Sequence, residues 1–158
     1  MRMNFRIASY LVSLALLISA IAPAAVRGRK AMYTGGTIGA IERGTKGILD
    51  CSEGSDLVFT AHKQELLRVP FSNVTSIEYG QHAGRRIRAV LLGGGWPLLF
   101  SHKRRHYLSI GFTDLAGNSQ GAVFELAKHT VRTTLAALKA RTGKEIEFDS
   151  EDAKKNVD

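Results

Sequence analysis

The sequence predicts a mainly β (α+β) domain, and three observations favour this class. Short apolar runs alternate with turns rich in glycine, serine and asparagine along most of the chain. Sixteen glycines stand against only three prolines, a composition typical of folds with many turns and bulges. One amphipathic helical period follows near the carboxyl end. At 158 residues, the chain has room for one such domain with its own core.

The strand-like runs predict about seven antiparallel strands. The first five cover residues 33–41, 46–51, 57–60, 66–71 and 74–79. The clearest hairpin comes later, where residues 107–112 alternate and place Leu108, Ile110 and Phe112 on one face. Gly117 and Asn118 then supply the positive φ angles of a tight turn, and residues 122–126 return as the seventh strand.

The last predicted element is a helix that covers the sheet. One face of a 3.6-residue period carries Ala127, Val131, Leu135, Leu138 and Thr142. Gly143 is a natural helix stop, and basic residues precede it where the helix dipole is negative. Residues 149–158 hold one large apolar side chain and are predicted to form a polar disordered tail.

The amino-terminal residues have the pattern of a signal peptide. Arg2 and Arg6 precede an apolar run at 11–21, and Ala22-Pro23-Ala24 places small residues at the cleavage positions. We therefore expect a signal peptide at 1–24, an exported protein (periplasmic or secreted if bacterial) and a folded domain at 31–148. The alternative is an uncleaved membrane anchor, because residues 7–26 carry no charge and about twenty residues just span a bilayer.

The run Leu67-Arg68-Val69-Pro70-Phe71-Ser72-Asn73 and the strand that follows it to Tyr79 resemble bacterial pleckstrin-homology-like and GRAM-like domains. The hairpin at 107–126 running into the helix is similar too, so that the resemblance covers about residues 33–148. It implies a barrel of two nearly orthogonal sheets with the helix closing one end. Other small barrels with a terminal helix, or an α+β sheet with one helix, are the alternatives. Phosphoinositide-binding relatives carry several basic residues around the first hairpin. This chain has only Arg43 and Lys46 there, and no family binding residue is carried over.

A basic, apolar segment at 82–106 interrupts the strand rhythm. An uncharged stretch at 89–100 contains Trp96 and has cations on both sides, namely Arg85, Arg86, Arg88, Lys103, Arg104 and Arg105. The formal net charge of +8 favours anionic partners in general. These residues predict a contact with an anionic membrane surface or with a partner protein. The alternative is that the leucines pack back on the domain and the cations remain solvated.

The sequence contains no recognisable catalytic, cofactor or metal motif. His102 and His106 share a helical spacing, but no glutamate follows His102 as a metalloprotease would require. Cys51 is the only cysteine, and we expect it to be a small buried apolar residue. No catalytic residue, metal ligand or cofactor is therefore predicted.

Together these patterns predict an exported, non-enzymatic binding or scaffolding module. Its expected partner is an envelope protein or an anionic lipid surface. Nucleic acid is not expected, because the basic residues form no recognition helix. The alternatives are an enzyme without a recognisable motif and a structural protein that forms oligomers. The oligomeric state stays open.

Overall fold

The computed structural model describes residues 28–52, 54–81, 105–155 and 157. These residues form an eight-stranded sheet whose strands are β1 (Arg29–Gly36), β2 (Lys46–Asp50), β3 (Asp56–Ala61), β4 (Gln64–Pro70), β5 (Val74–Gly80), β6 (His106–Thr113), β7 (Ser119–Leu126) and β8 (Ile146–Phe148). The helical elements are η1 (Phe71–Asn73), η2 (Lys128–Thr130), α3 (Val131–Thr142) and α4 (Glu151–Lys155). Among the described residues, no helix has the length and apolar character needed to cross a bilayer.

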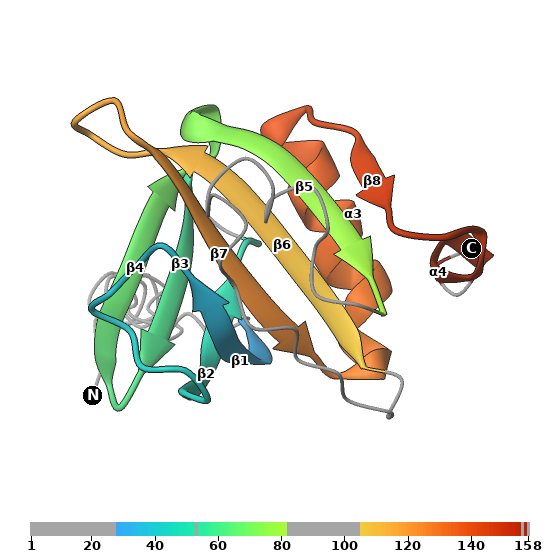
Figure 1. Cartoon of the computed structure of the whole chain (residues 1–158), viewed down its shortest axis with the longest axis horizontal. Coiled ribbons are helices and arrows are strands. Elements are labelled where there is room, and N and C mark those ends of the chain that lie inside the picture. Colours follow the sequence, from blue (N-terminus) through green and yellow to red (C-terminus); the bar gives the residue numbers. More distant parts are fainter. Residues whose placement is uncertain (1–27, 53, 82–104, 156, 158) are drawn as a thin grey trace, which may run out of the picture.

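The sheet consists of two antiparallel meanders joined through β1. Its order is β4-β3-β2-β1-β7-β6-β5-β8, so that β1 pairs with both β2 and β7 (Figure 1). The prediction of a mainly β domain with one long carboxyl-terminal helix is confirmed. The sheet differs from a closed antiparallel barrel in two respects. It has an open order with β4 and β8 at its edges, and β8 runs parallel to β5.

The core lies on the face where the two meanders meet. Phe124 on the central strand β7 is fully buried, with its ring 5.1 Å from that of Phe59 and 5.8 Å from that of Tyr33. Alternation along the strands produces this core, since every second side chain of β3 is buried. Burial of these large rings is the main favourable contribution to folding.

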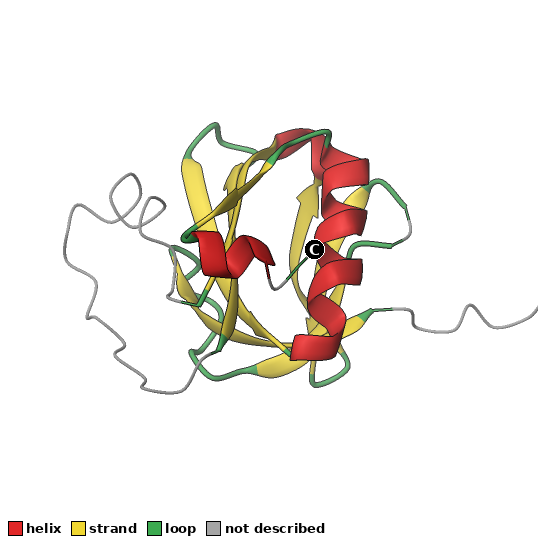
Figure 2. Cartoon of the chain, turned by 90° about the vertical axis from the view of Figure 1, so that its right-hand side faces the viewer, coloured by secondary structure: helices red, strands yellow, loops and turns green. Residues whose placement is uncertain are grey.

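Helix α3 completes the core and begins later than the helical period predicts. Val131, Leu135 and Leu138 of the predicted stripe are buried, while residues 128–130 form η2 instead of the first helical turn. The helix ends as predicted at Gly143, which has a φ of 67° and donates its N–H to the carbonyl of Lys139. Figure 2 shows α3 lying along the curved sheet.

Two short elements follow α3: β8 lies within the predicted domain at 31–148, and α4 lies within the predicted polar tail at 149–158. Strand β8 pairs Ile146 with Ile77 and Phe148 with Tyr79, and the next residues form α4. Ala153 in α4 has no exposed surface and belongs to the hydrophobic core cluster, whereas the other residues of α4 are exposed. Both elements are too short to show a hydrophobic period, and a remote strand provides the partners of β8.

Strand β1 is displaced toward the amino terminus relative to its predicted range of 33–41. It covers Arg29–Gly36, and residues 37–45 form a loop. The last residue of the strand is Gly36, which has a φ of 152° and lies against β7. A β-carbon at this position would stand 2.1 Å from the carbonyl oxygen of Gly121. The strand therefore ends where only glycine fits.

Candidate functional site

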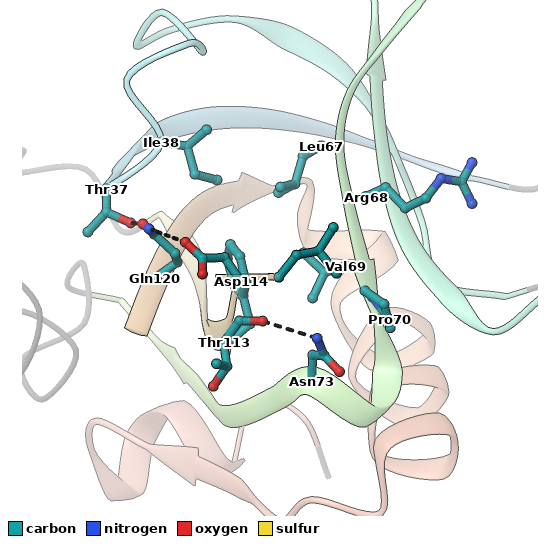
Figure 3. A pocket seen from close by; sticks show the side chains of 12 residues that line it. Thr37, Ile38, Leu67, Arg68, Val69, Pro70, Asn73, Thr113, Asp114 and Gln120 are labelled. Atoms are coloured by element: carbon teal, nitrogen blue, oxygen red, sulfur yellow. Dashed lines mark hydrogen bonds between the residues drawn. The ribbon is translucent and has the colours of Figure 1, made fainter. Parts of the chain in front are cut away.

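A groove of about 290 Å³ lies beside the edge strand β4 (Figure 3). We call it the β4 groove. Four regions line it: the β1–β2 loop, β4, the end of η1, and the β6–β7 hairpin. Its lining residues are Thr37, Ile38, Leu67, Arg68, Val69, Pro70, Asn73, Phe112, Thr113, Asp114, Leu115 and Gln120.

Apolar side chains form much of the groove lining. Val69 and Phe112 are buried parts of the core, and Leu67 and Ile38 are partly buried against it. Leu115, at the β6–β7 turn, is 98% exposed and is the exposed large hydrophobic residue of the described chain. Apolar surface that remains accessible beside a concave site favours an apolar binding partner.

The polar side chains of the groove are held in place by local hydrogen bonds. The Asp114 carboxylate accepts the backbone N–H groups of Ala116 and Asn118 at 2.9 and 2.8 Å and the side-chain amide of Gln120 at 3.0 Å. The Gln120 bond, followed by the backbone N–H of Asn118, lowers the pKa of Asp114. Across the groove, the Asn73 amide donates to the Thr113 carbonyl at 3.2 Å. The rim is therefore preorganised.

On the exposed side of β4, Arg68 forms ion pairs with two carboxylates. Its guanidinium lies 2.8 Å from an oxygen of Asp56, and its Nε donates to Glu65 at 2.7 Å. Hydrogen bonding to Arg68 is the main reason why the pKa values of both carboxyls are lowered. The cation is thus neutralised within β3 and β4, and the β4 groove presents no free positive charge from Arg68.

A scan of protein-family models, a search of curated proteins and a search of solved structures each gave no match. The site is therefore interpreted from its own geometry.

The structure describes one of the seven predicted contact residues. Arg105 lies just before β6 and forms an ion pair of 2.6 Å with Glu125 of β7. The hydrogen bond that Arg105 donates to the Glu125 carboxylate raises the pKa of Arg105. The other six lie outside the described residues: Arg85, Arg86, Arg88, Trp96, Lys103 and Arg104.

The β4 groove was not predicted from the sequence, because its walls come from separate strands. One local signal was available at Leu115. A lone leucine between Asp114 and Gly117, within a predicted turn, indicates an apolar side chain that the turn itself does not bury. The contribution of Leu67 and Ile38 depends on the pairing of β1 with β7 and has no local signal.

The described residues contain no group of three or more histidine, cysteine and acidic side chains placed to hold a metal ion. Cys51 is buried, as the sequence predicts, and burial raises its pKa to about 11, which disfavours the reactive thiolate. The ring of His106 contacts a tyrosine. The Tyr79 hydroxyl lies 2.6 Å from Nδ1 of His106, and the two rings are stacked.

This contact predicts a pH dependence of stability. Desolvation, and then the charge of Lys128, lower the pKa of His106 in the folded state, whereas Glu125 acts in the opposite direction. Below its unfolded pKa of about 6.5, His106 is therefore protonated more readily in the unfolded chain, and stability decreases as the pH falls. We expect His106→Asn to reduce the slope of unfolding free energy against pH between about pH 7 and 5. Urea denaturation across this range measures it, with His129→Asn, which removes an exposed histidine, as control. An unchanged slope in His106→Asn would contradict the prediction.

Proposed function

We propose that this chain is an exported, non-enzymatic binding module that holds an extended segment of a partner protein in the β4 groove. The observation that carries the proposal is the position of an apolar groove directly beside an edge strand. The signal-peptide pattern at residues 1–24 supports export.

We propose a pleckstrin-homology-like arrangement for the domain. The meanders β1–β4 and β5–β7 support it, as does the position of α3 after the last strand of the second meander. In Figure 1, β3 and β4 run in a different direction from β5 and β6. Contact between α3 and η1 places the helix against the connection between the two meanders. Strand β8 and α4 are additions to this plan.

An edge strand gives a protein segment a place to dock. In the described sheet, β4 pairs with β3 alone, so its other side is available for main-chain hydrogen bonds. A peptide that adds to such an edge gains affinity from its backbone and specificity from pockets that receive alternate side chains. The β4 groove provides one such pocket, with Leu67 and Leu115 among its apolar residues.

The chemistry of the β4 groove supports binding rather than catalysis. Asp114 is the groove carboxylate, and donors from its own turn and from Gln120 occupy its oxygens. Its lowered pKa keeps it ionised at neutral pH, which is unsuited to general acid catalysis. Thr37 is likewise engaged, since its hydroxyl donates to Gln120 and accepts the N–H of Gly121.

We also propose that the basic segment 82–106 contacts an anionic membrane surface, through the cations and Trp96 named above. In the described part of this segment, the ion pair between Arg105 and Glu125 ties its end to β7. The segment and the β4 groove then contact different partners.

The peptide-binding function is tested with a phage-displayed library of random ten-residue peptides selected against the purified protein. We expect selected peptides to bind about tenfold more weakly to Leu67→Gln, because an apolar contact worth about 1–3 kcal/mol is lost. Leu66→Gln is the matched control, since Leu66 is also partly buried on β4 but does not line the groove.

Amide hydrogen exchange provides the second measurement. A peptide added to the edge protects backbone N–H groups of β4, whereas a side chain held in the pocket alone does not. Peptides that bind both leucine variants equally would disprove the groove proposal. Loss of binding at higher protein concentration, with a dimer seen by sedimentation, would show instead that a second copy occupies the groove.

A further inference from the structure

The charge of the β4 groove has the opposite sign to that of the whole chain. The chain has a formal net charge of +8. One acidic and one basic side chain line the groove, Asp114 and Arg68. Arg68 is paired with both Asp56 and Glu65, so that these four groups, one cation and three carboxylates, carry a net charge of −2. The groove is therefore an acidic site on a basic chain.

The negative charge of Asp114 is held in the groove without being cancelled. Its carboxylate accepts hydrogen bonds from the backbone N–H groups of Ala116 and Asn118 and from the side-chain amides of Asn118 and Gln120. All of these donors are neutral, and Asp114 forms no ion pair within the part of the chain that the structure describes. The hydrogen bonds favour the ionised carboxylate and leave its charge available to a cation of a partner.

Two neighbouring side chains fix the position of this charge. The Thr37 hydroxyl donates to the side-chain carbonyl of Gln120, which directs the amide N–H groups of Gln120 to Asp114 at 3.0 Å. Figure 3 shows the Asp114 and Gln120 side chains in contact, with the Arg68 guanidinium directed away from both. Because Thr37 belongs to the β1–β2 loop and Asp114 to the β6–β7 hairpin, the charge is held between two walls of the groove.

We infer that the β4 groove selects an extended peptide segment that carries a lysine or arginine beside an apolar residue. This inference rests on the proposed peptide-binding function and names the chemistry of the partner. The apolar residue contacts Leu67 and Leu115, and the cation lies near Asp114, which directly precedes Leu115. Side chains two residues apart share one face of an extended peptide and are about 7 Å apart, so we expect the two groups at positions i and i+2.

An acidic segment fits the β4 groove less well. Its carboxylate would meet the like charge of Asp114, and Arg68 is already shared between Asp56 and Glu65. Like charges placed together weaken binding, whereas complementary charges contribute specificity. The charges around the groove therefore favour a cationic partner.

The test compares peptides selected from the ten-residue library on the wild-type protein and on Asp114→Asn. We expect lysine or arginine to be enriched two residues from an apolar position with the wild type, and this enrichment to be lost with the variant. A peptide selected on the wild type should bind Asp114→Asn about threefold to fivefold more weakly at low salt, the effect of an exposed ion pair. This difference should decrease as the salt concentration rises.

Glu151→Gln is the matched control. Glu151 is exposed on α4 and does not line the groove, and either substitution raises the formal net charge of +8 by one. We expect the control to bind the selected peptides as tightly as the wild type does. Equal losses of affinity in Asp114→Asn and Glu151→Gln would overturn the inference, because the effect would then come from net charge alone.

A substitution in the peptide tests the same contact without changing the turn at Asp114. Replacing the enriched lysine or arginine by glutamine should weaken binding to the wild type and leave binding to Asp114→Asn unchanged, which completes a double-mutant cycle. Binding of the original peptide to the wild type should also fall as salt rises, and binding of the glutamine peptide should not. An affinity of the wild type that is the same for both peptides would overturn the inference.

Dependence on Leu67 separates this inference from the proposed function. Peptides that bind Leu67→Gln more weakly than Leu66→Gln, but carry no enriched cation or carry enriched acidic residues, would overturn the cation selectivity alone. Selected peptides that bind both leucine variants equally would reject the groove function, and the inference with it.

Discussion

Phe124→Ala is expected to lower the unfolding free energy by about 3–5 kcal/mol, the largest effect among the substitutions considered. Phe124 has no exposed surface and sits on β7, which pairs with both β1 and β6. The Phe124 ring contacts the rings of Tyr33 and Phe59, so its removal leaves a cavity between them. Because domains of this size have about 5–15 kcal/mol in total, the loss consumes much of the stability.

Urea denaturation followed by far-ultraviolet circular dichroism measures this effect. Val123→Ala is the control, because Val123 is the neighbouring residue, only partly buried, on the opposite face of β7. We expect this control to lose about 1 kcal/mol or less. A loss in Phe124→Ala no larger than that in the control would contradict the packing of the two meanders around Phe124.

Gly36→Ala is expected to destabilise the protein by about 2–3 kcal/mol and to disturb the β4 groove. Its new β-carbon would meet the Gly121 carbonyl oxygen at 2.1 Å, and both are backbone positions that cannot rotate away. The next residue, Thr37, lines the groove and donates its backbone N–H to the same carbonyl at 2.9 Å. Moving β1 from β7 therefore also moves the groove wall.

Gly39→Ala is the control for this effect. A β-carbon at Gly39 would have no heavy atom within 4 Å, and its φ is not in the left-handed region. We expect it to change the unfolding free energy by less than about 0.5 kcal/mol. The two variants are compared by thermal unfolding and by affinity for a selected peptide. If Gly36→Ala matched Gly39→Ala in both measurements, the close approach of β1 and β7 at Gly36 would be wrong.

Both substitutions act on the same seam, where β1 pairs with β7. Tyr33 and Phe124 are opposite each other in that register although they are far apart in the chain. A core built on such a non-local contact depends on its central residues more than on any one turn.

Local patterns in the amino-acid sequence are enough to predict several strands and the long helix. Alternation of Leu108, Ile110 and Phe112 predicts β6, and the period of Val131, Leu135 and Leu138 predicts α3, which ends at Gly143 as expected. These patterns are visible because each element faces one core with a fixed repeat of side chains. The burial of Cys51 was also predictable, because a lone thiol between apolar strands behaves as a small hydrophobic group.

The way in which those elements combine into a site follows from the three-dimensional packing of the chain. The β4 groove brings Ile38, Leu67 and Leu115 together from segments that are separated in sequence. Strand β8 shows the same dependence, because its three residues are recognised as a strand only through their pairing with β5. The physical reason is that periodicity records which side of an element is buried, whereas register and neighbour are set by packing between distant segments.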